Sequence, residues 1–384
     1  MKQLAILVIV CAQQLLMAQS STPVPGVIGQ DSKNRTITTA VPFLTITPDA
    51  RAAALGDAGV ATSADVNAAY WNSAKLAFTE DKAGIGLSYT PWLAKIINDM
   101  YIFYLSGYYK IDREQTIGVS MKYFDMGVVN LRDANNQETG YQNPRDFAID
   151  VTYSRLLSEN LSIGGAIRFI HSNLIGANAG FDTRPGKSVA VDMGIYYNKP
   201  LVNETSTLSL GASITNVGAK MSYSNADVKD FIPGNLRLGG AYQIEVGPSN
   251  SFTFIMDFNK LLVPSPKADH SQRDKSLLSG VFGSFGDAPG GFSEEIREIM
   301  LSSGVEYWYN KTFAGRLGYF NEAYDKGNRK YITSGVGFKK DLFGLDVAYM
   351  VPINKRENAL AETIRFSLVF TPRFKGNQAV EETP

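Results

Sequence analysis

The sequence predicts an all-β protein: a 14-stranded antiparallel transmembrane β-barrel with a short N-terminal hatch segment inside it. Three observations support this prediction. Many short segments alternate apolar with polar residues, their connections are alternately short and long, and a secretion signal precedes them. A two-residue period puts the two kinds of side chain on opposite faces of a strand. A barrel in a membrane turns the apolar face toward lipid.

The composition is compatible with a membrane barrel and gives no sign of a nucleic-acid partner. The 384 residues include 37 basic and 37 acidic side chains, so no charge excess favours nucleic acid. The 19 tyrosines and 21 phenylalanines suit aromatic girdles at two membrane interfaces.

Residues 1–18 read as a cleavable signal peptide. Lys2 precedes an apolar stretch, and Ala18 offers a cleavage site. A membrane-anchoring helix would need about 20 apolar residues, and Gln13 and Gln14 interrupt this stretch. The only cysteine, Cys11, would leave with the signal, so we expect no disulfide and no cysteine chemistry in the mature chain.

Residues 19–82 are predicted to form a leader and the hatch. The leader, to about residue 47, is rich in Thr, Pro, Ser and Gln. Residues 48–62 are dense in small side chains, which permit the close packing that a segment inside a barrel requires. Asp65 is predicted to cap a short helix over residues 66–76. A soluble helix and turn is the alternative.

From residue 83 to residue 374 we expect the barrel. The last strand carries the aromatic residue Phe374, and residues 375–384 then form a periplasmic tail. The predicted strands are 84–92, 100–111, 115–125, 146–156, 161–172, 187–198, 206–218, 235–246, 251–260, 302–309, 312–321, 330–339, 343–352 and 363–374.

The connections alternate between tight and long, which is typical of membrane barrels with periplasmic turns and extracellular loops. A soluble all-β fold has no reason to place its long loops at one end. The tight links lie near 112–114, 158–160, 247–250, 310–311 and 340–342; the long ones lie near 127–145, 173–186, 219–234, 262–301 and 353–362.

The inward-facing positions carry charges of both signs. Because buried charges must be paired to be tolerated, we expect a mutually neutralising network and a plugged or narrow interior; a charged path for a polar solute is the alternative. The inward set is Lys122, Asp150, Arg168, Asp192, Arg237, Asp257, Glu306, Arg316, Asp346 and Arg365.

The sequence gives little support for an enzyme, and we predict no catalytic residue, metal or cofactor. His171 falls on the lipid side of a strand. His270 has Asp269 and Ser271 as sequence neighbours, but a catalytic triad needs groups that converge in space. No metal-ligand cluster or phosphate-binding loop stands out.

The connection from 262 to about 301 is the strongest candidate for a binding surface, because loops of about 40 residues are usually functional or disordered. Ser293 is predicted to cap a helix with Ile296, Ile299 and Met300 on one face. Exposed apolar groups need cover, so they either fold back over the barrel mouth or meet a partner. The candidate binding residues are Leu277, Leu278, Phe282, Phe285, Phe292, Ile296 and Met300.

The segment from Phe43 to Leu76 resembles the N-terminal hatch signature of FadL-like 14-stranded barrels. It departs from that signature at Leu55, where methionine is usual, and at Ser73, where proline is usual. Over nearly the whole mature length the chain more closely resembles the PorV family of the type IX secretion system. The residues that carry the hatch signature are Arg51, Gly56, Asp57, Asp65, Trp71 and Asn72.

The PorV resemblance implies an outer-membrane protein without a reaction of its own. It would bind the C-terminal signal domain of secreted cargo at the large translocon barrel and deliver the cargo to a cell-surface attachment complex, surrounded by outer-membrane lipids. FadL-like uptake of hydrophobic molecules is an alternative, with Tyr104, Tyr108 and Phe320 lining a pocket. A lipopolysaccharide O-deacylase, a role attached to some such proteins by name, is a third.

Overall fold

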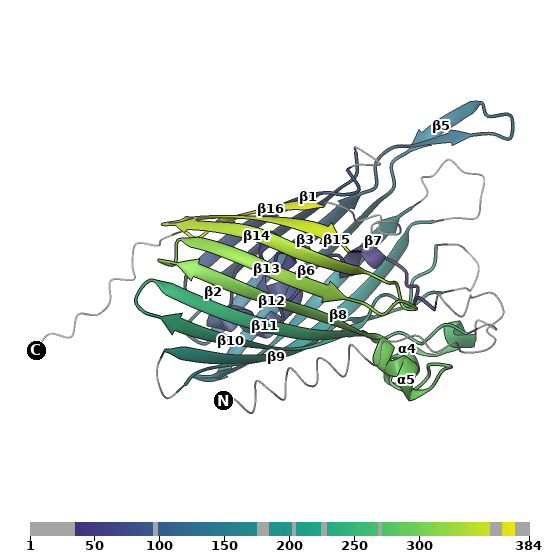
Figure 1. Cartoon of the computed structure of the whole chain (residues 1–384). Helices are drawn as coiled ribbons and strands as arrows, with labels where there is room; N and C mark the ends of the chain where they lie inside the picture. The colour runs from purple at the N-terminus through teal and green to yellow at the C-terminus, as the bar shows by residue number, and fades with distance from the viewer. Residues whose placement is uncertain are drawn as a thin grey trace, which may run out of the picture.

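The computed structural model describes residues 35–94, 99–174, 184–201, 205–223, 229–267, 271–353 and 363–372. Within these residues, 14 strands close into a barrel in which each strand is antiparallel to both neighbours (Figure 1). The barrel strands are β1 (Ala83–Pro91), β2 (Tyr101–Lys110), β3 (Gln115–Asp125), β6 (Arg145–Ser158), β7 (Leu161–Asn173), β8 (Gly186–Pro200), β9 (Ser206–Gly218), β10 (Asn235–Val246), β11 (Asn250–Leu261), β12 (Ile299–Tyr309), β13 (Phe313–Asn321), β14 (Lys330–Lys340), β15 (Phe343–Pro352) and β16 (Ile364–Phe370).

Every predicted barrel strand is present, with differences at the ends. β12 begins at Ile299, three residues before its prediction, and β16 ends at Phe370, because Thr371 and Pro372 leave the ladder. Phe374 lies outside the described residues, as do the predicted signal peptide (1–18), most of the leader and the tail (375–384).

The alternation in the sequence becomes two faces of the barrel wall. Along β6, Ile149 and Val151 are exposed on the outside, whereas Asp150 and Thr152 are buried on the inside. Period-two alternation therefore separates a lipid-facing surface from a polar lumen.

The seam that closes the barrel is short. β1 and β16 pair over five residue pairs, from Ile85–Phe370 to Tyr89–Phe366. The pairing of β6 with β7 covers 13 residue pairs.

The long connections lie at one end of the barrel, and the tight turns lie at the other (Figure 1). The connection after β3 contains a hairpin that the sequence did not predict, β4 (Val129–Arg132) and β5 (Glu138–Gln142). Its turn is held locally, since the Asp133 carboxylate accepts the backbone N–H groups of Asn135 and Gln137. The hydrogen bonds of the Asp133 side chain therefore favour a turn here, although the residues on either side do not alternate between apolar and polar.

Within the described residues, the hatch lies inside the barrel and contains four short helices (Figure 1). They are η1 (Pro42–Thr45), α2 (Ala50–Ala53), α3 (Ala68–Trp71) and η2 (Ser73–Phe78). The predicted single helix over 66–76 is wrong, because the backbone is extended at Asn72. The predicted cap is also wrong: Asn67 occupies the N-cap of α3, and the Asp65 carboxylate accepts the Asn67 N–H at 2.9 Å. In the described ranges, no helix combines the length and the apolar character that crossing a membrane requires.

Candidate functional site

Asp49 and Trp71 join two parts of the hatch to each other. The Asp49 carboxylate caps α2 by accepting the Ala52 N–H, and it also accepts the Trp71 indole N–H at 2.8 Å. Both residues are buried, so this bond is shielded from water. A side-chain cap that also binds a tryptophan fixes the start of α2 against α3.

Arg51 connects the hatch to the barrel wall through ion pairs. Its guanidinium contacts Asp65 within the hatch at 2.9 Å and Glu306 on β12 at 2.8 Å. Glu306 also pairs with Arg316 at 2.7 Å, which in turn contacts Asp346 at 2.6 Å. Two cations and three carboxylates therefore satisfy one another across the hatch and three strands.

Gly56 and Asp57 form a turn that lies against β13 and β14. Gly56 has a φ of 69°, and a Cβ atom there would lie 2.4 Å from the backbone oxygen of Tyr319. Only glycine fits both the left-handed backbone and this close approach. The Asp57 carboxylate accepts the hydroxyl of Tyr331 on β14.

Asn72 lies where the helix breaks, and its side chain explains the break. Its amide oxygen accepts the Ala74 N–H, and its amide nitrogen donates to the Ile195 carbonyl of β8 at 2.9 Å. A Cβ on Gly194 would lie 2.1 Å from the Asn72 oxygen, so the wall is hollowed to receive this side chain. Nearby, Asp257 of β11 accepts the N–H groups of Gly59 and Val60.

The predicted network of inward charges is present, but only part of it consists of ion pairs. Arg168 bridges Asp150 and Asp192 on the neighbouring strands. Lys122 instead donates to the Ile46 carbonyl of the hatch, and Arg237 donates to the Tyr70 carbonyl and stacks on Trp71. Thus backbone groups of the hatch satisfy several wall charges.

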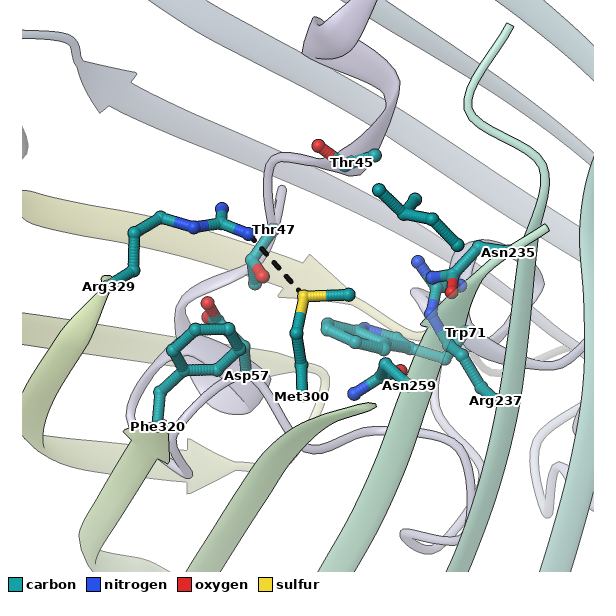
Figure 2. A pocket seen from close by; sticks show the side chains of 11 residues that line it. Thr45, Thr47, Asp57, Trp71, Asn235, Arg237, Asn259, Met300, Phe320 and Arg329 are labelled. Carbon is teal, nitrogen blue, oxygen red and sulfur yellow. Dashed lines mark hydrogen bonds between the residues drawn. The ribbon is translucent and has the colours of Figure 1, made fainter. Parts of the chain in front are cut away.

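A small cavity of about 70 Å³ lies between the hatch and the inner wall (Figure 2). Arg237 and Arg329 lie on opposite sides of it, with Met300 between them. Because one water needs roughly 10–15 Å³ by this measure, the cavity accommodates a few waters. Its lining is Thr45, Thr47, Asp57, Trp71, Asn235, Arg237, Asn259, Leu261, Met300, Phe320 and Arg329.

The connection between β11 and β12 forms a lid, by which we mean residues 262–267 and 271–298, at the long-loop end (Figure 1). It contains η3 (Ser271–Asp274), α4 (Leu277–Gly283), capped by the Ser276 side chain, and α5 (Phe292–Arg297). Four predicted binding residues are exposed on it: Leu278 at 62%, Phe282 at 73%, Phe285 at 52% and Phe292 at 80%. Leu277 is half-buried.

The predicted helix face in the lid is wrong. α5 begins after Gly291, with no cap from Ser293, and it ends at Arg297, whereas Ile299 and Met300 belong to β12. Met300 is buried and lines the cavity, and Ile296 is half-buried. Glu294, Glu295 and Arg297 form the buried side of α5, so this helix turns charge inward.

The underside of the lid is a cluster of buried ion pairs that sequence reasoning missed. Lys326 contacts Glu294 and Glu298 at 2.6 and 2.9 Å, and Lys260 contacts Glu298 and Glu295 at 2.6 and 3.1 Å. Two further pairs, Arg35–Glu294 at 2.6 Å and Arg297–Asp325 at 3.0 Å, complete it. The sequence does carry one sign of this cluster, the charged run Glu294-Glu295-Ile296-Arg297-Glu298. The side chains that pair with this run come from distant segments, so the pairing could not be predicted.

Burial acts to raise the pKa of Glu294, but its partners outweigh that effect. The Lys326 ammonium, the Gly290 N–H and the Arg35 guanidinium together hold the pKa below its usual range. The lid is therefore anchored by a carboxylate that stays charged at neutral pH.

His171 lies on the outer side of β7 and stacks on Phe147, with 5.0 Å between the ring centroids. His270 lies outside the described residues. The described residues contain no cluster of three or more metal-binding side chains.

Comparison with known proteins now decides the family. Residues 29–268, more than half of the chain, match the family model described as type IX secretion system protein PorV. The chain belongs to the PorV family. A comparison with curated proteins finds no match.

Solved structures similar to this PorV family member include a hydrocarbon channel and a toluene transporter. The TodX monoaromatic hydrocarbon channel, as a deltaS2S3 mutant, matches with a TM-score of 0.53 and 12% identity, covering 85% of this chain and 99% of that one. The P. putida toluene transporter TodX matches with a TM-score of 0.50 and 11% identity, covering 85% and 98%. At such identities the likeness shows the fold alone.

Family and fold together give the location and general class of this PorV family member. It is an integral outer-membrane β-barrel and belongs to a family of type IX secretion components. The matches reported above are a secretion component, a hydrocarbon channel and a toluene transporter.

Proposed function

We propose that this barrel is a non-catalytic binding and delivery module of type IX secretion. It binds the C-terminal signal domain of secreted cargo at the large translocon barrel and delivers the cargo to the cell-surface attachment complex. The observation that carries the proposal is the lid, which presents Leu278, Phe282, Phe285 and Phe292 to solvent. Phenylalanine is enriched in the cores of protein interfaces, and exposed apolar side chains grouped on one element mark such sites.

The buried base of the lid supports a docking role. Ion pairs from Lys260, Lys326 and Arg35 hold α5 and Glu298, while the aromatic side chains Phe282, Phe285 and Phe292 are exposed. A rigid platform lowers the ordering cost of binding. Of the two possibilities that the sequence left open, folding back or meeting a partner, the exposure of Phe282, Phe285 and Phe292 supports the second.

Uptake of hydrophobic molecules is less well supported. Tyr104 packs on the hatch residues Tyr70 and Trp71, and Phe320 stacks on Tyr331 at 4.7 Å. Tyr104 and Phe320, which would line a hydrophobic pocket, thus already pack against other aromatic side chains. The cavity of about 70 Å³ is also much smaller than small-molecule sites, which are roughly 300–1,000 Å³.

The test replaces Phe282 and Phe285 with serine in the same chain. We expect secreted cargo in the medium to fall several-fold, because docking loses two interface side chains, while the amount of folded barrel in the outer membrane is unchanged. Cargo and barrel are both measured by quantitative immunoblotting.

The matched control is Tyr141→Ser. Tyr141 is 72% exposed, close to the 73% of Phe282, but it lies on the β4–β5 hairpin. Normal secretion by the double serine variant would remove the lid from the proposal. An equal loss of secreted cargo in Tyr141→Ser would mean that the effect of removing an exposed aromatic side chain is not specific to the lid.

A further inference from the structure

The first described residues lie among the long connections. The Arg35 N–H donates to the Asp325 carbonyl at 2.6 Å, and the Arg35 guanidinium contacts Glu294 of the lid. The Ala40 N–H donates to the Phe231 carbonyl at 2.9 Å. Residues 231, 294 and 325 belong to three different connections at the long-loop end of the barrel, and in an outer-membrane barrel this end faces the cell exterior.

The chain then enters the lumen from that end. Phe43 and Leu44 pack in one cluster with Trp92, which lies between β1 and β2, and with Met221, which lies in the same connection as Phe231. Further along, Ala54 lies against Gly335 of β14, inside the barrel.

The hatch leaves at the opposite end. The Lys110 ammonium donates to the Thr79 carbonyl at 2.6 Å, and the Lys110 N–H donates to the Lys82 carbonyl at 2.8 Å. Lys110 is the last residue of β2, directly before the tight turn to β3. β1 then begins at Ala83 and runs back toward the long-loop end.

We propose that the chain enters its own barrel through the cell-surface mouth and fills it in a single pass. Residues 35–40 then lie at the cell-surface end beside the lid, and the segment can be reached from outside the cell at its exposed position. Thr38 is the exposed residue of this segment. This proposal is independent of the proposed function, since it concerns only the direction in which the hatch passes through the barrel.

The absence of any cysteine after Cys11 makes a direct test possible. Three single variants are compared: Thr38→Cys in the proposed surface segment, Ser279→Cys in the lid, and Glu159→Cys in the tight turn between β6 and β7. All three positions are exposed. Cells are treated with a membrane-impermeant maleimide, either intact or after the outer membrane has been permeabilised, with the unsubstituted protein as background.

We expect Thr38→Cys and Ser279→Cys to be labelled in intact cells, and Glu159→Cys to be labelled only after permeabilisation. Heat-dependent gel mobility confirms that each variant is a folded barrel. Labelling of Thr38→Cys only after permeabilisation, or not at all, would overturn the proposal. If Ser279→Cys were also inaccessible in intact cells, the orientation of the whole barrel would be the assumption that failed.

Discussion

At the scale of single residues, glycines of the barrel wall determine how closely the hatch approaches. A Cβ on Gly318 of β13 would lie 2.1 Å from the Gly56 nitrogen and 2.3 Å from the Leu55 carbonyl carbon. Both are backbone atoms, which cannot move aside as a flexible side chain can. Gly315, three residues earlier in the same strand, has no atom within 4 Å of the corresponding point.

These two glycines give a matched pair of variants. We expect Gly318→Ala to lower the free energy of unfolding by about 1–3 kcal/mol, the usual cost of overpacking. Gly315→Ala should change it by less than about 0.5 kcal/mol, as surface substitutions do. The measurement is denaturant unfolding of the purified barrel in detergent. Equal stability of the two variants would show that the hatch is not held as closely as described.

At the scale of elements, the lid depends on Glu294 being charged. Its pKa in the folded lid lies below the ordinary value of 4.5. The stabilisation from its ion pairs is therefore fully present above the unfolded-state pKa and is lost as the pH falls through the folded pKa.

We therefore expect amides of α5 to stay protected from hydrogen exchange from pH 7 down to the ordinary glutamate pKa of 4.5, and to lose protection only as the pH falls further, through the lowered pKa of Glu294. The measurement is exchange followed by mass spectrometry, corrected for the intrinsic dependence of exchange on pH. Amides in β7 serve as the internal control, since they should remain protected throughout. Loss of α5 protection well above pH 4.5, while β7 stays protected, would contradict this account of the lid.

At the scale of the whole molecule, the hatch and its contacts fill the lumen. We expect the purified protein to show no steady conductance in planar bilayers. A variant lacking residues 49–78 should conduct once its heat-dependent gel mobility shows a folded barrel, because porin-sized barrels without a plug carry an aqueous channel. Open steps of similar size in the unaltered protein would instead favour the uptake alternative.

The strands were predictable because their pattern is local. In β6, residues 149–152 show the alternation directly, and the tight turns mark where each strand ends. The hatch helix was predicted wrongly because Asn72 bonds to β8, more than 100 residues away. The charged side of α5 was missed for the same reason: Lys260, Lys326 and Arg35 reach it only in the folded barrel.

The short seam and the threaded hatch together constrain how the molecule is assembled. The hatch meets one mouth at Arg35, continues into β1 at the other, and leaves no space for a later passage. If the barrel closed first, the segment before β1 would have to be threaded through the whole length of the closed lumen. We therefore expect β1 and β16 to pair, over their five residue pairs, only after the hatch has taken its place between the strands.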